Sequence, residues 1–111
     1  MGNKFLSLLG LAQRSGNLVT GEDTCEASIK KGNIKLVVVA VDASENTKKK
    51  FHDLCAYRKI RMEVFGDREQ MSHSIGKINR TVYAIKDKAF SEEIVKLIQE
   101  EASGSKKSGG E

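Results

Sequence analysis

Four side chains in the sequence could bind a metal ion or act as a catalytic thiol and base: Cys25, His52, Cys55 and His73. His52 and Cys55 are three residues apart in a predicted helix, which would supply half of a zinc site. A structural zinc ion normally takes four Cys or His ligands, so all four residues would have to converge. Both cysteines fall on the predicted buried stripes of their helices, where a free cysteine usually packs as a small apolar residue and does not become a thiolate. The sequence therefore predicts neither a metal site nor a Cys–His catalytic pair.

Asp42 is the remaining candidate for acid–base chemistry. It follows an apolar run, and α/β enzymes place carboxylates at the C-terminal ends of such strands. Aspartate is also a common N-cap residue, and we favour the role of Asp42 as the cap of the next helix. A Walker A loop ending at Gly76-Lys77 would need Gly and Ser or Thr where the chain has Met71 and Ile78, and no G-x-G-x-x-G occurs. We predict that the protein is not an enzyme and takes no cofactor, with a small enzyme using Asp42 as an alternative.

Segments of helical and strand periodicity alternate along the chain. Helices are predicted at residues 3–14, 21–31, 45–58 and 67–76 and from Phe90 onward, where apolar residues recur at intervals of three and four. Strands are predicted at residues 36–40, 62–65 and 81–85, and the first of these is apolar on both faces, as in a strand covered by helices on both sides. Thr20 is the expected N-cap of the second helix, in a capping box with Asp23, Asp67 is that of the short helix near residues 67–76, and Ser91 that of the last helix. Residues 18–19 are expected to form a short apolar link.

This order of elements predicts an α/β fold, a single-domain three-layer α/β/α sandwich with a small mixed sheet. The length of 111 residues suits one domain. We place that domain at residues 1–102. Residues 103–111, with the sequence SGSKKSGGE, are predicted to form a disordered polar tail.

Composition narrows the class of protein further. No apolar run approaches the roughly 20 residues of a membrane span, the N-terminal segment is a poor signal peptide, and two isolated cysteines give no disulfide framework. We therefore predict a cytoplasmic protein with no membrane partner. The net charge is +4, and the segment from Lys48 to Arg61 holds six basic residues against Asp53 alone. Such asymmetry is typical of a nucleic-acid-binding face, although a solvated Lys-rich helix face gives the same pattern.

Three motifs within residues 14–51 (RSGNLVTGEDTCEASIKKGNIKLVVVAVDASENTKKKF) carry a family resemblance. A Ser-Gly-x-x-x-x-Gly turn ending at Gly21 leads into the second helix, a Lys-Gly-x-x-Lys-Leu-Val segment starts at Lys31, and residues 40–49 read Ala-x-Asp-Ala-Ser-x-Asn-Thr-Lys-Lys. With these motifs, residues 3–100 resemble the ribosomal protein L7Ae/L30e superfamily, with the features of its bacterial YlxQ-like branch. The resemblance implies a non-catalytic, ribosome-associated protein that binds kink-turns or similar structured RNA.

The resemblance also implies where RNA would bind. In that superfamily the N-terminus of the second helix enters the groove of the bent RNA, and a loop resembling Leu-Gly-x-Ala-x-Gly, here residues 71–77, contacts the RNA from the other side. A helix N-terminus offers unpaired N–H groups and a positive dipole end to phosphate, and Gly21 permits close approach of the backbone. The residues expected to bind RNA, with the cations expected near these two elements, are Arg14, Gly21, Glu22, Asp23, Thr24, Lys30, Lys31, Asp42, Met71, Ser72, His73, Gly76 and Lys77.

The start of the second helix departs from the signature of kink-turn readers. Those proteins resemble one another in Gly-x-Asn-Glu-x-x-Lys or Gly-x-Lys-Gln-x-x-Lys, whereas Gly21 is followed here by Asp23, Thr24 and Ala27 at the signature positions. Asp23 could accept a hydrogen bond from a guanine edge, but the lysine is missing. With the family resemblance as a whole, we predict a monomer whose partners are RNA and the ribosome. A protein–protein interaction module on the same fold, with an acidic first turn that faces a basic partner, is the alternative.

Overall fold

A four-stranded mixed sheet forms the middle layer of the computed structural model, which describes the backbone of residues 3–110 and the side chains of residues 4–102. The strands are β1 (Leu18–Thr20), β2 (Leu36–Val39), β3 (Arg61–Val64) and β4 (Val82–Ile85), in the spatial order β1-β4-β2-β3. β2 runs parallel to β3, and β4 runs antiparallel to both β1 and β2. The small mixed sheet predicted from the sequence is therefore confirmed.

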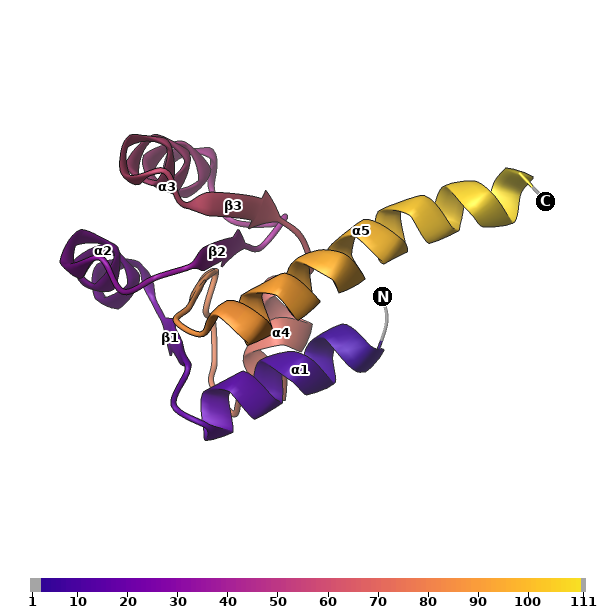
Figure 1. Cartoon of the computed structure of the whole chain (residues 1–111), viewed down its shortest axis with the longest axis horizontal. Helices are drawn as coiled ribbons and strands as arrows, with labels where there is room; N and C mark the ends of the chain where they lie inside the picture. The colour runs from indigo at the N-terminus through magenta and orange to yellow at the C-terminus, as the bar shows by residue number, and fades with distance from the viewer. Residues whose placement is uncertain (1–2, 111) are drawn as a thin grey trace.

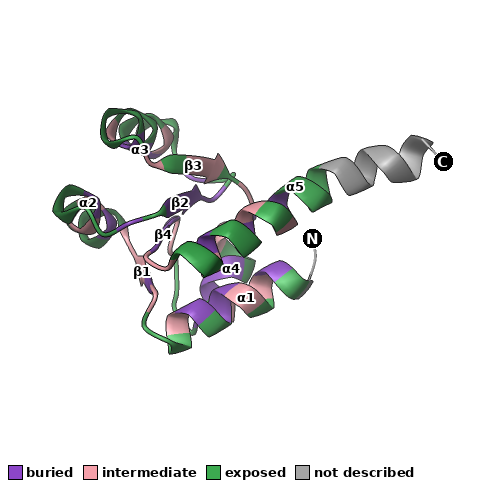
Figure 2. Cartoon of the chain, in the orientation of Figure 1, coloured by how far each residue is buried: buried purple, intermediate pink, exposed green. Residues whose placement is uncertain are grey.

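Five helices cover the two faces of this sheet, as Figure 1 shows. Their bounds are α1 (Asn3–Arg14), α2 (Glu22–Lys31), α3 (Glu45–Arg58), α4 (Arg68–Ser74) and α5 (Lys88–Gly110). Side chains alternate along each strand, because successive residues of a strand point to opposite faces. Leu36 and Val38 pack with α1, α4 and α5, whereas Val37 and Val39 pack with α2 and α3. Both faces of β2 are buried, which confirms the predicted three layers (Figure 2).

The structure corrects the predicted start of the second helix. Residues 18–20 form strand β1, which pairs with β4 so that Leu18 lies opposite Ile85, and they are not merely a link. Thr20 belongs to this strand and does not cap α2. The N-cap is Gly21, and no side chain donates or accepts a capping hydrogen bond there. Three residues are too few for strand periodicity to be recognised, so this edge strand could be identified only by its partner in the sheet.

The start of the last helix is also corrected. Asp87, and not Ser91, caps α5: its carboxylate accepts a 2.8 Å hydrogen bond from the backbone N–H of Phe90. Ser91 lies one turn inside the helix, where its hydroxyl donates to the Asp87 carbonyl at 2.8 Å. The predicted cap at Asp67 is confirmed, since its side chain accepts from the Gln70 N–H. The disordered tail expected at residues 103–111 lies outside the described side chains and stays a prediction.

Candidate functional site

The two elements predicted to bind RNA meet at one end of the sheet. β1, β2 and β3 end there and β4 begins there, because β4 alone runs in the opposite direction. The Gly21 N–H donates to the Val82 carbonyl at 3.1 Å, which fixes the start of α2 beside the α4–β4 loop, residues 75–81. The Ala40 N–H donates to the Thr81 carbonyl at 2.9 Å, so the turn between β2 and α3 lies on the other side of the same loop. We call this the α2-start end.

Gly21 gives α2 an unusual opening. Its backbone has φ 95° and ψ 149°, a conformation that is essentially restricted to glycine. A Cβ atom built on Gly21 would meet no heavy atom within 4 Å, so the space beside it is open. Glu22, Asp23 and Thr24 follow and are exposed, and the first N–H groups of the helix have no side-chain cap. The first turn of α2 therefore presents backbone donors next to open space.

Glu22 is held by the neighbouring helix. Its carboxylate accepts a 2.8 Å hydrogen bond from the Thr47 hydroxyl and lies 3.9 Å from the Lys50 ammonium. Lys50 also pairs with Glu26 at 2.9 Å, and hydrogen bonds from Lys50 and Lys30 hold the pKa of Glu26 below its usual range. Asp23 forms no hydrogen bond or ion pair among the described residues, although its charge acts on the Lys50 ammonium. Lys50 thus ties α3 to α2, whereas Lys48 and Lys49 pair within α3, with Glu45 and Asp53.

Asp42 does not cap the helix that follows it, which corrects the prediction. Ser44 caps α3, its hydroxyl oxygen accepting from the Thr47 N–H at 3.1 Å. The Asp42 carboxylate instead accepts from the Arg68 N–H at 3.0 Å, and its second oxygen lies 3.5 Å from the Arg68 guanidinium. Arg68 also donates to the Asn79 side chain at 3.0 Å. Asp42 therefore joins the β2–α3 turn to α4 and the α4–β4 loop through a residue that no sequence motif singled out.

Met71 and Ser72 lie beneath the loop and not on its surface. Met71 is 0% exposed and Ser72 3% exposed. The Ser72 hydroxyl accepts from the Arg80 N–H at 2.8 Å and lies 3.2 Å from the Tyr83 hydroxyl, which itself donates to the Arg80 carbonyl at 2.9 Å. Burial raises the pKa of Tyr83. These residues fix the shape of the α4–β4 loop from inside the core.

The exposed part of the predicted loop is His73, Gly76 and Lys77. Gly76 has φ 71°, and the Lys77 N–H donates to the Ser72 carbonyl at 2.9 Å, so the chain reverses here over the end of α4. The next residue, Ile78, is 85% exposed and was missed as a site residue, although an apolar residue between Lys77 and Asn79 at a loop tip is a sequence signal. Arg14 lines a hollow on α1 and α4 together with His73 and Ser74.

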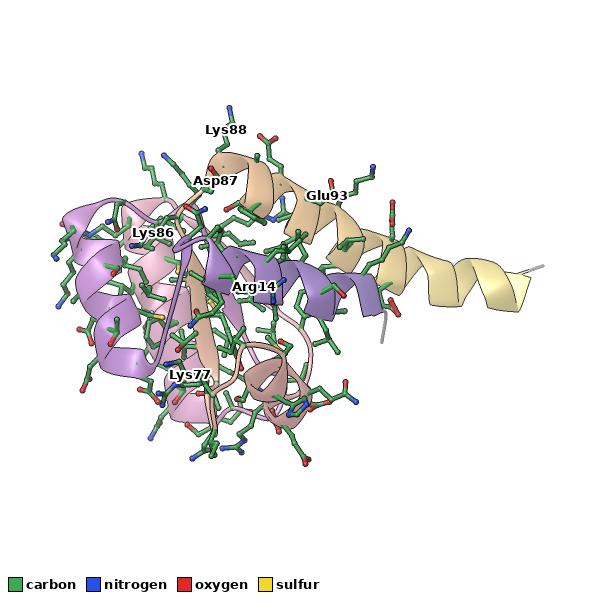
Figure 3. The ribbon with its side chains drawn as sticks, turned by 90° about the horizontal axis from the view of Figure 1, so that it is seen from below. Arg14, Lys77, Lys86, Asp87, Lys88 and Glu93 are labelled. Atoms are coloured by element: carbon green, nitrogen blue, oxygen red, sulfur yellow. The ribbon has the colours of Figure 1, made fainter. Side chains whose placement is uncertain are left out.

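Lys30 and Lys31 lie away from these elements. They form the last turn of α2, and ten helical residues separate the two ends of that helix by about 15 Å. The side chain of Lys30 pairs with Glu26 at 3.0 Å. Viewed from below, Lys77 lies on the opposite side of the molecule from Lys86 and Lys88, with Arg14 between them (Figure 3). The structure thus brings the α4–β4 loop and the start of α2 together but leaves Lys30 and Lys31 at the far end of α2.

The cysteines occupy the core, as predicted. Burial raises the pKa of the Cys25 thiol to about 12 and that of the Cys55 thiol to about 11, so both stay protonated at neutral pH. Among the described residues, no group of three or more His, Cys, Asp or Glu side chains is placed to hold a metal ion. No helix in the same part of the chain is long and apolar enough to cross a membrane.

Comparison with known proteins places the chain in a family. The profile of the ribosomal protein L7Ae/L30e/S12e/Gadd45 family matches residues 3–95. The chain is similar to the RNA-binding protein YlxQ of Bacillus subtilis, at 38% identity over 97 residues that cover 87% of this chain and 97% of that protein. It is similar to the RNA-binding protein YlxQ of Enterococcus faecium, at 42% identity over 97 residues that cover 86% and 92%.

Solved structures show the same relationship. A Bacillus halodurans protein of unknown function superposes with a TM-score of 0.84 at 40% identity, over 88% of this chain and 99% of that one. A 15.5 kD RNA-binding protein from Giardia lamblia superposes with a TM-score of 0.69 over 90% and 89% of the two chains, and at 14% identity this likeness shows the fold alone. On this evidence, the chain belongs to the ribosomal protein L7Ae/L30e/S12e/Gadd45 family.

Proposed function

We propose that this protein binds structured, kink-turn-like RNA at the α2-start end, without catalysing a reaction. The observation that carries the proposal is the 3.1 Å hydrogen bond from Gly21 to Val82, which fixes the uncapped start of α2 beside the α4–β4 loop. Two relatives at about 40% identity are named RNA-binding proteins, which supports RNA as the ligand. In this proposal the protein acts as a monomer in the cytoplasm and associates with the ribosome.

The residues at this end take different roles. The backbone of Glu22, Asp23 and Thr24 offers N–H donors to the RNA, since a helix N-terminus binds anions well, and Gly21, whose own N–H is bonded to Val82, leaves open space beside them. His73, Gly76 and Lys77 contact the RNA from the α4–β4 side, where they are exposed. Met71, Ser72 and Asp42 act indirectly, because their side chains are buried or bonded to other parts of the protein. Arg14 is close enough to His73 to contribute a phosphate contact.

A binding titration tests the proposal. The probes are a kink-turn RNA and a control RNA whose sheared G·A pairs are replaced, each measured at about 50 and 200 mM salt. We expect tight binding of the kink-turn RNA and weak binding of the control. Equal, weak and salt-dependent binding of both would show a general RNA binder without kink-turn specificity. Absence of binding at both salt concentrations would overturn the proposal.

Lys77→Ala tests the contact surface itself, with Lys96→Ala on the outside of α5 as the matched control. We expect Lys77→Ala to weaken binding and to reduce the salt slope by about 0.7 to 0.9, the value of one phosphate contact. Lys96→Ala should change neither. If both variants bind like the unaltered protein, the α4–β4 loop does not contact phosphate.

Asp23→Asn tests how the acidic first turn acts. Asp23 is exposed and forms no hydrogen bond or ion pair among the described residues, and its charge, although close enough to act on Lys50, repels phosphate. The substitution should leave RNA affinity unchanged or raise it. A large loss of affinity would show instead that the carboxylate accepts hydrogen bonds from a base.

A protein–protein interaction module is the second candidate function. The observation that favours it is the pairing of an exposed acidic turn with two exposed apolar side chains at the same end, Val41 at 50% and Ile78 at 85% exposure. An interface of this kind would bind a basic partner with apolar anchors. If the protein binds RNA at neither salt concentration but binds a purified basic ribosomal protein, the interaction module is favoured over the RNA proposal.

A further inference from the structure

The two ends of the sheet differ in charge. At the α2-start end, carboxylates outnumber cations: Glu22, Asp23, Asp42, Glu45, Asp67 and Glu69 lie there with Lys48, Arg68, Lys77 and Arg80. At the opposite end, where α2 and α3 stop and β2 and β3 begin, the chain places Lys30, Lys31, Lys35, Arg58, Lys59, Arg61, Lys86 and Lys88. We call this set the basic end.

Backbone pairing brings the cations of the basic end together. Leu36 is in register with both Arg61 and Ile85, and the Lys35 N–H donates to the Ile85 carbonyl at 2.8 Å. Neighbouring strands lie about 4.8 Å apart, so the backbones of Lys86, Lys35 and Arg61 lie at the same end of three adjacent strands, β4, β2 and β3. A groove of about 500 Å³ runs between these strand ends and α5, and its lining holds three cations, Lys35, Arg61 and Lys88, and one carboxylate, Glu92. The arrangement is therefore one continuous surface.

Helices α2 and α3 add their C-terminal turns to this surface. They lie side by side and run in the same direction, since Glu22 contacts Thr47 and Glu26 contacts Lys50 one turn further along. Their last turns therefore finish at the same end of the sheet and carry Lys30, Lys31 and Arg58. Figure 1 shows the two helices next to each other on one face of the sheet.

Several of these cations are not used in ion pairs. Lys30, Arg61 and Lys88 have carboxylate neighbours, at 3.0, 2.7 and 3.9 Å respectively. No ion pair is formed within the described part of the chain by Lys31, Lys35, Arg58, Lys59 or Lys86. The nearby Asp87 carboxylate is taken up as the cap of α5. The surface thus keeps an excess of unpaired positive charge.

Helix stability explains only part of this charge. Cations are favourable in the last turn of a helix, which accounts for Lys31 and Arg58. Lys86 and Lys88 stand at the start of α5, where the helix dipole disfavours a cation, and Lys35 stands in a loop before a strand. Lys88 has its ion pair with Glu92, whereas Lys35 and Lys86 have neither an ion pair among the described residues nor a favourable helix dipole, so a negatively charged ligand would account for their positions.

An exposed aromatic ring identifies the class of that ligand. Tyr57, in the last turn of α3, is 81% exposed, whereas the other tyrosine of the chain, Tyr83, is fully buried. The Arg58 guanidinium carbon lies 5.9 Å from the centre of the Tyr57 ring. Surfaces that bind single-stranded nucleic acid combine cations along the backbone with aromatic rings and arginine planes on which unpaired bases stack. A ring exposed within a basic surface matches that combination.

We propose that the basic end binds a single-stranded RNA segment, with Tyr57 stacking on an unpaired base and Lys31, Lys35 and Arg58 contacting phosphates. The proposal rests on the proposed function in taking RNA as the ligand. It adds a second contact surface at the far side of the molecule from the α2-start end. One protein molecule then holds two segments of the same RNA, a structured element at one end and a single strand at the other.

The test uses the full chain and a fluorescent oligouridine of about 12 nucleotides, which has no secondary structure and fits the size of a single-strand site. Fluorescence anisotropy gives its affinity at about 50 and 200 mM salt. Lys31→Gln, Lys35→Gln and Arg58→Gln are combined in one variant. The matched control, Lys4→Gln, Lys49→Gln and Lys96→Gln, removes the same net charge from exposed positions outside the basic end.

The basic-end variant should bind oligouridine about tenfold or more weakly at the lower salt concentration. Its salt slope should be smaller by about 2, because each phosphate contact contributes roughly 0.7 to the slope. The control variant should stay within about twofold of the unaltered protein. If the two variants bind oligouridine with equally reduced affinity, net charge alone explains the binding, and the proposal is wrong.

Tyr57 is tested separately because stacking and charge are different contributions. Tyr57→Ala should weaken oligouridine binding about fivefold or more, and Tyr57→Phe should stay close to the unaltered protein, since the phenyl ring still stacks. The chain has no tryptophan, so its intrinsic fluorescence comes from Tyr57 and the buried Tyr83, and the Tyr57→Phe variant gives the signal of Tyr83 alone. Oligouridine should quench this fluorescence in the unaltered protein but not in Tyr57→Phe. Equal affinity of Tyr57→Ala and the unaltered protein would refute the stacking contact.

Two competitors test the class of ligand. Tighter binding of a plain A-form RNA duplex than of oligouridine would overturn the assignment to a single strand. Equally effective competition by a polyglutamate peptide of the same charge would show a general anion surface and overturn the assignment to RNA. Kink-turn RNA without a single-stranded extension separates the two proposals. The basic-end variant should bind this RNA as tightly as the unaltered protein does. If the unaltered protein binds oligouridine but not kink-turn RNA, the proposed function is wrong. If it binds kink-turn RNA but its oligouridine affinity does not depend on the basic end, this inference is wrong.

Discussion

At the scale of single residues, Gly21 decides how the second helix can meet a ligand. Its φ of 95° and ψ of 149° lie where a side chain is strained, although a Cβ atom would have open space around it. Gly32, at the other end of α2, is a useful contrast. It also has open space and a positive φ of 87°, but its ψ of 17° is the left-handed helical conformation that other residues adopt at lower cost.

Substitution of these two glycines should therefore have unequal effects. Gly21→Ala should lower the free energy of unfolding by about 1 to 3 kcal/mol, and Gly32→Ala by about 1 kcal/mol. Urea denaturation measures both. Gly21→Ala should also weaken kink-turn binding, because the backbone of the first turn has to shift, whereas Gly32→Ala should leave it unchanged. Equal losses of stability and binding would show that the conformation of Gly21 has no special role.

The two buried thiols make stability depend on pH in the alkaline range. Their pKa values of about 12 for Cys25 and about 11 for Cys55 exceed the value of about 8.5 expected in the unfolded chain. Because the folded state holds each thiol proton more tightly than the unfolded chain does, protonation of the two thiols stabilises the folded state. The stabilisation is complete below the unfolded pKa and is lost as the pH rises from about 9 through the folded values.

Each thiol should contribute a fall of about 1.4 kcal/mol per pH unit in the free energy of unfolding between about pH 9 and 11. Denaturation of the unaltered protein and of Cys25→Ala over this range measures the difference in slope. Both thiols should also resist a disulfide reagent at pH 8 until the protein unfolds. Rapid modification of Cys25 in the folded protein would contradict its burial.

At the scale of elements, the α4–β4 loop depends on buried polar groups beneath it. Ser72 and Tyr83 hold the backbone of Arg80, and Arg68 connects Asp42 with Asn79 on the outer side. These bonds join α4, β4 and the β2–α3 turn into one unit. Residues 71–77 therefore divide into an inner set that shapes the loop and an outer set that is open to solvent.

Ser72→Ala and His73→Ala distinguish these two sets. Ser72→Ala leaves the partly buried Arg80 N–H without its partner and should lower the free energy of unfolding by about 1 to 3 kcal/mol. His73→Ala removes an exposed side chain and should change stability by less than about 0.5 kcal/mol while weakening RNA binding. Thermal unfolding and RNA titration are measured on both. Unchanged stability of Ser72→Ala would contradict its role as a support.

At the scale of the whole molecule, the core and the charge are distributed differently. Helices cover both faces of the sheet, so the core is symmetric about it, with one apolar cluster on each side. Charge is distributed unevenly along the direction of the strands, from the acid-rich α2-start end to the basic end. A protein built in this way keeps its two ends free for contacts because neither is needed for the core.

Truncation after Ala102 tests where the folded domain ends. The last buried apolar side chain that α5 contributes, among those described, is Ile98, and residues 103–111 contain no large apolar side chain. The shortened chain should unfold within about 0.5 kcal/mol of the full chain, as for changes outside the core. Circular dichroism during urea denaturation measures this. A loss of several kcal/mol would show that residues 103–111 belong to the folded domain.

Periodicity and local motifs were enough to predict the layers and the family. Several helices have apolar residues at intervals of three and four, β2 is a continuous apolar run, and the three glycine- and lysine-containing motifs are local in the chain, so all could be recognised without coordinates. The buried cysteines followed from the same helical periodicity, and the cap at Asp67 from the residue type that helix starts prefer.

Features that depend on contacts between distant segments could be learned only from the folded chain. Strand β1 exists because β4 pairs with it, Asp42 binds Arg68 from another helix, and Ser72 faces inward. Lys30 and Lys31, although close in sequence to Gly21, lie at the other end of α2, because a helix separates in space what the chain keeps near.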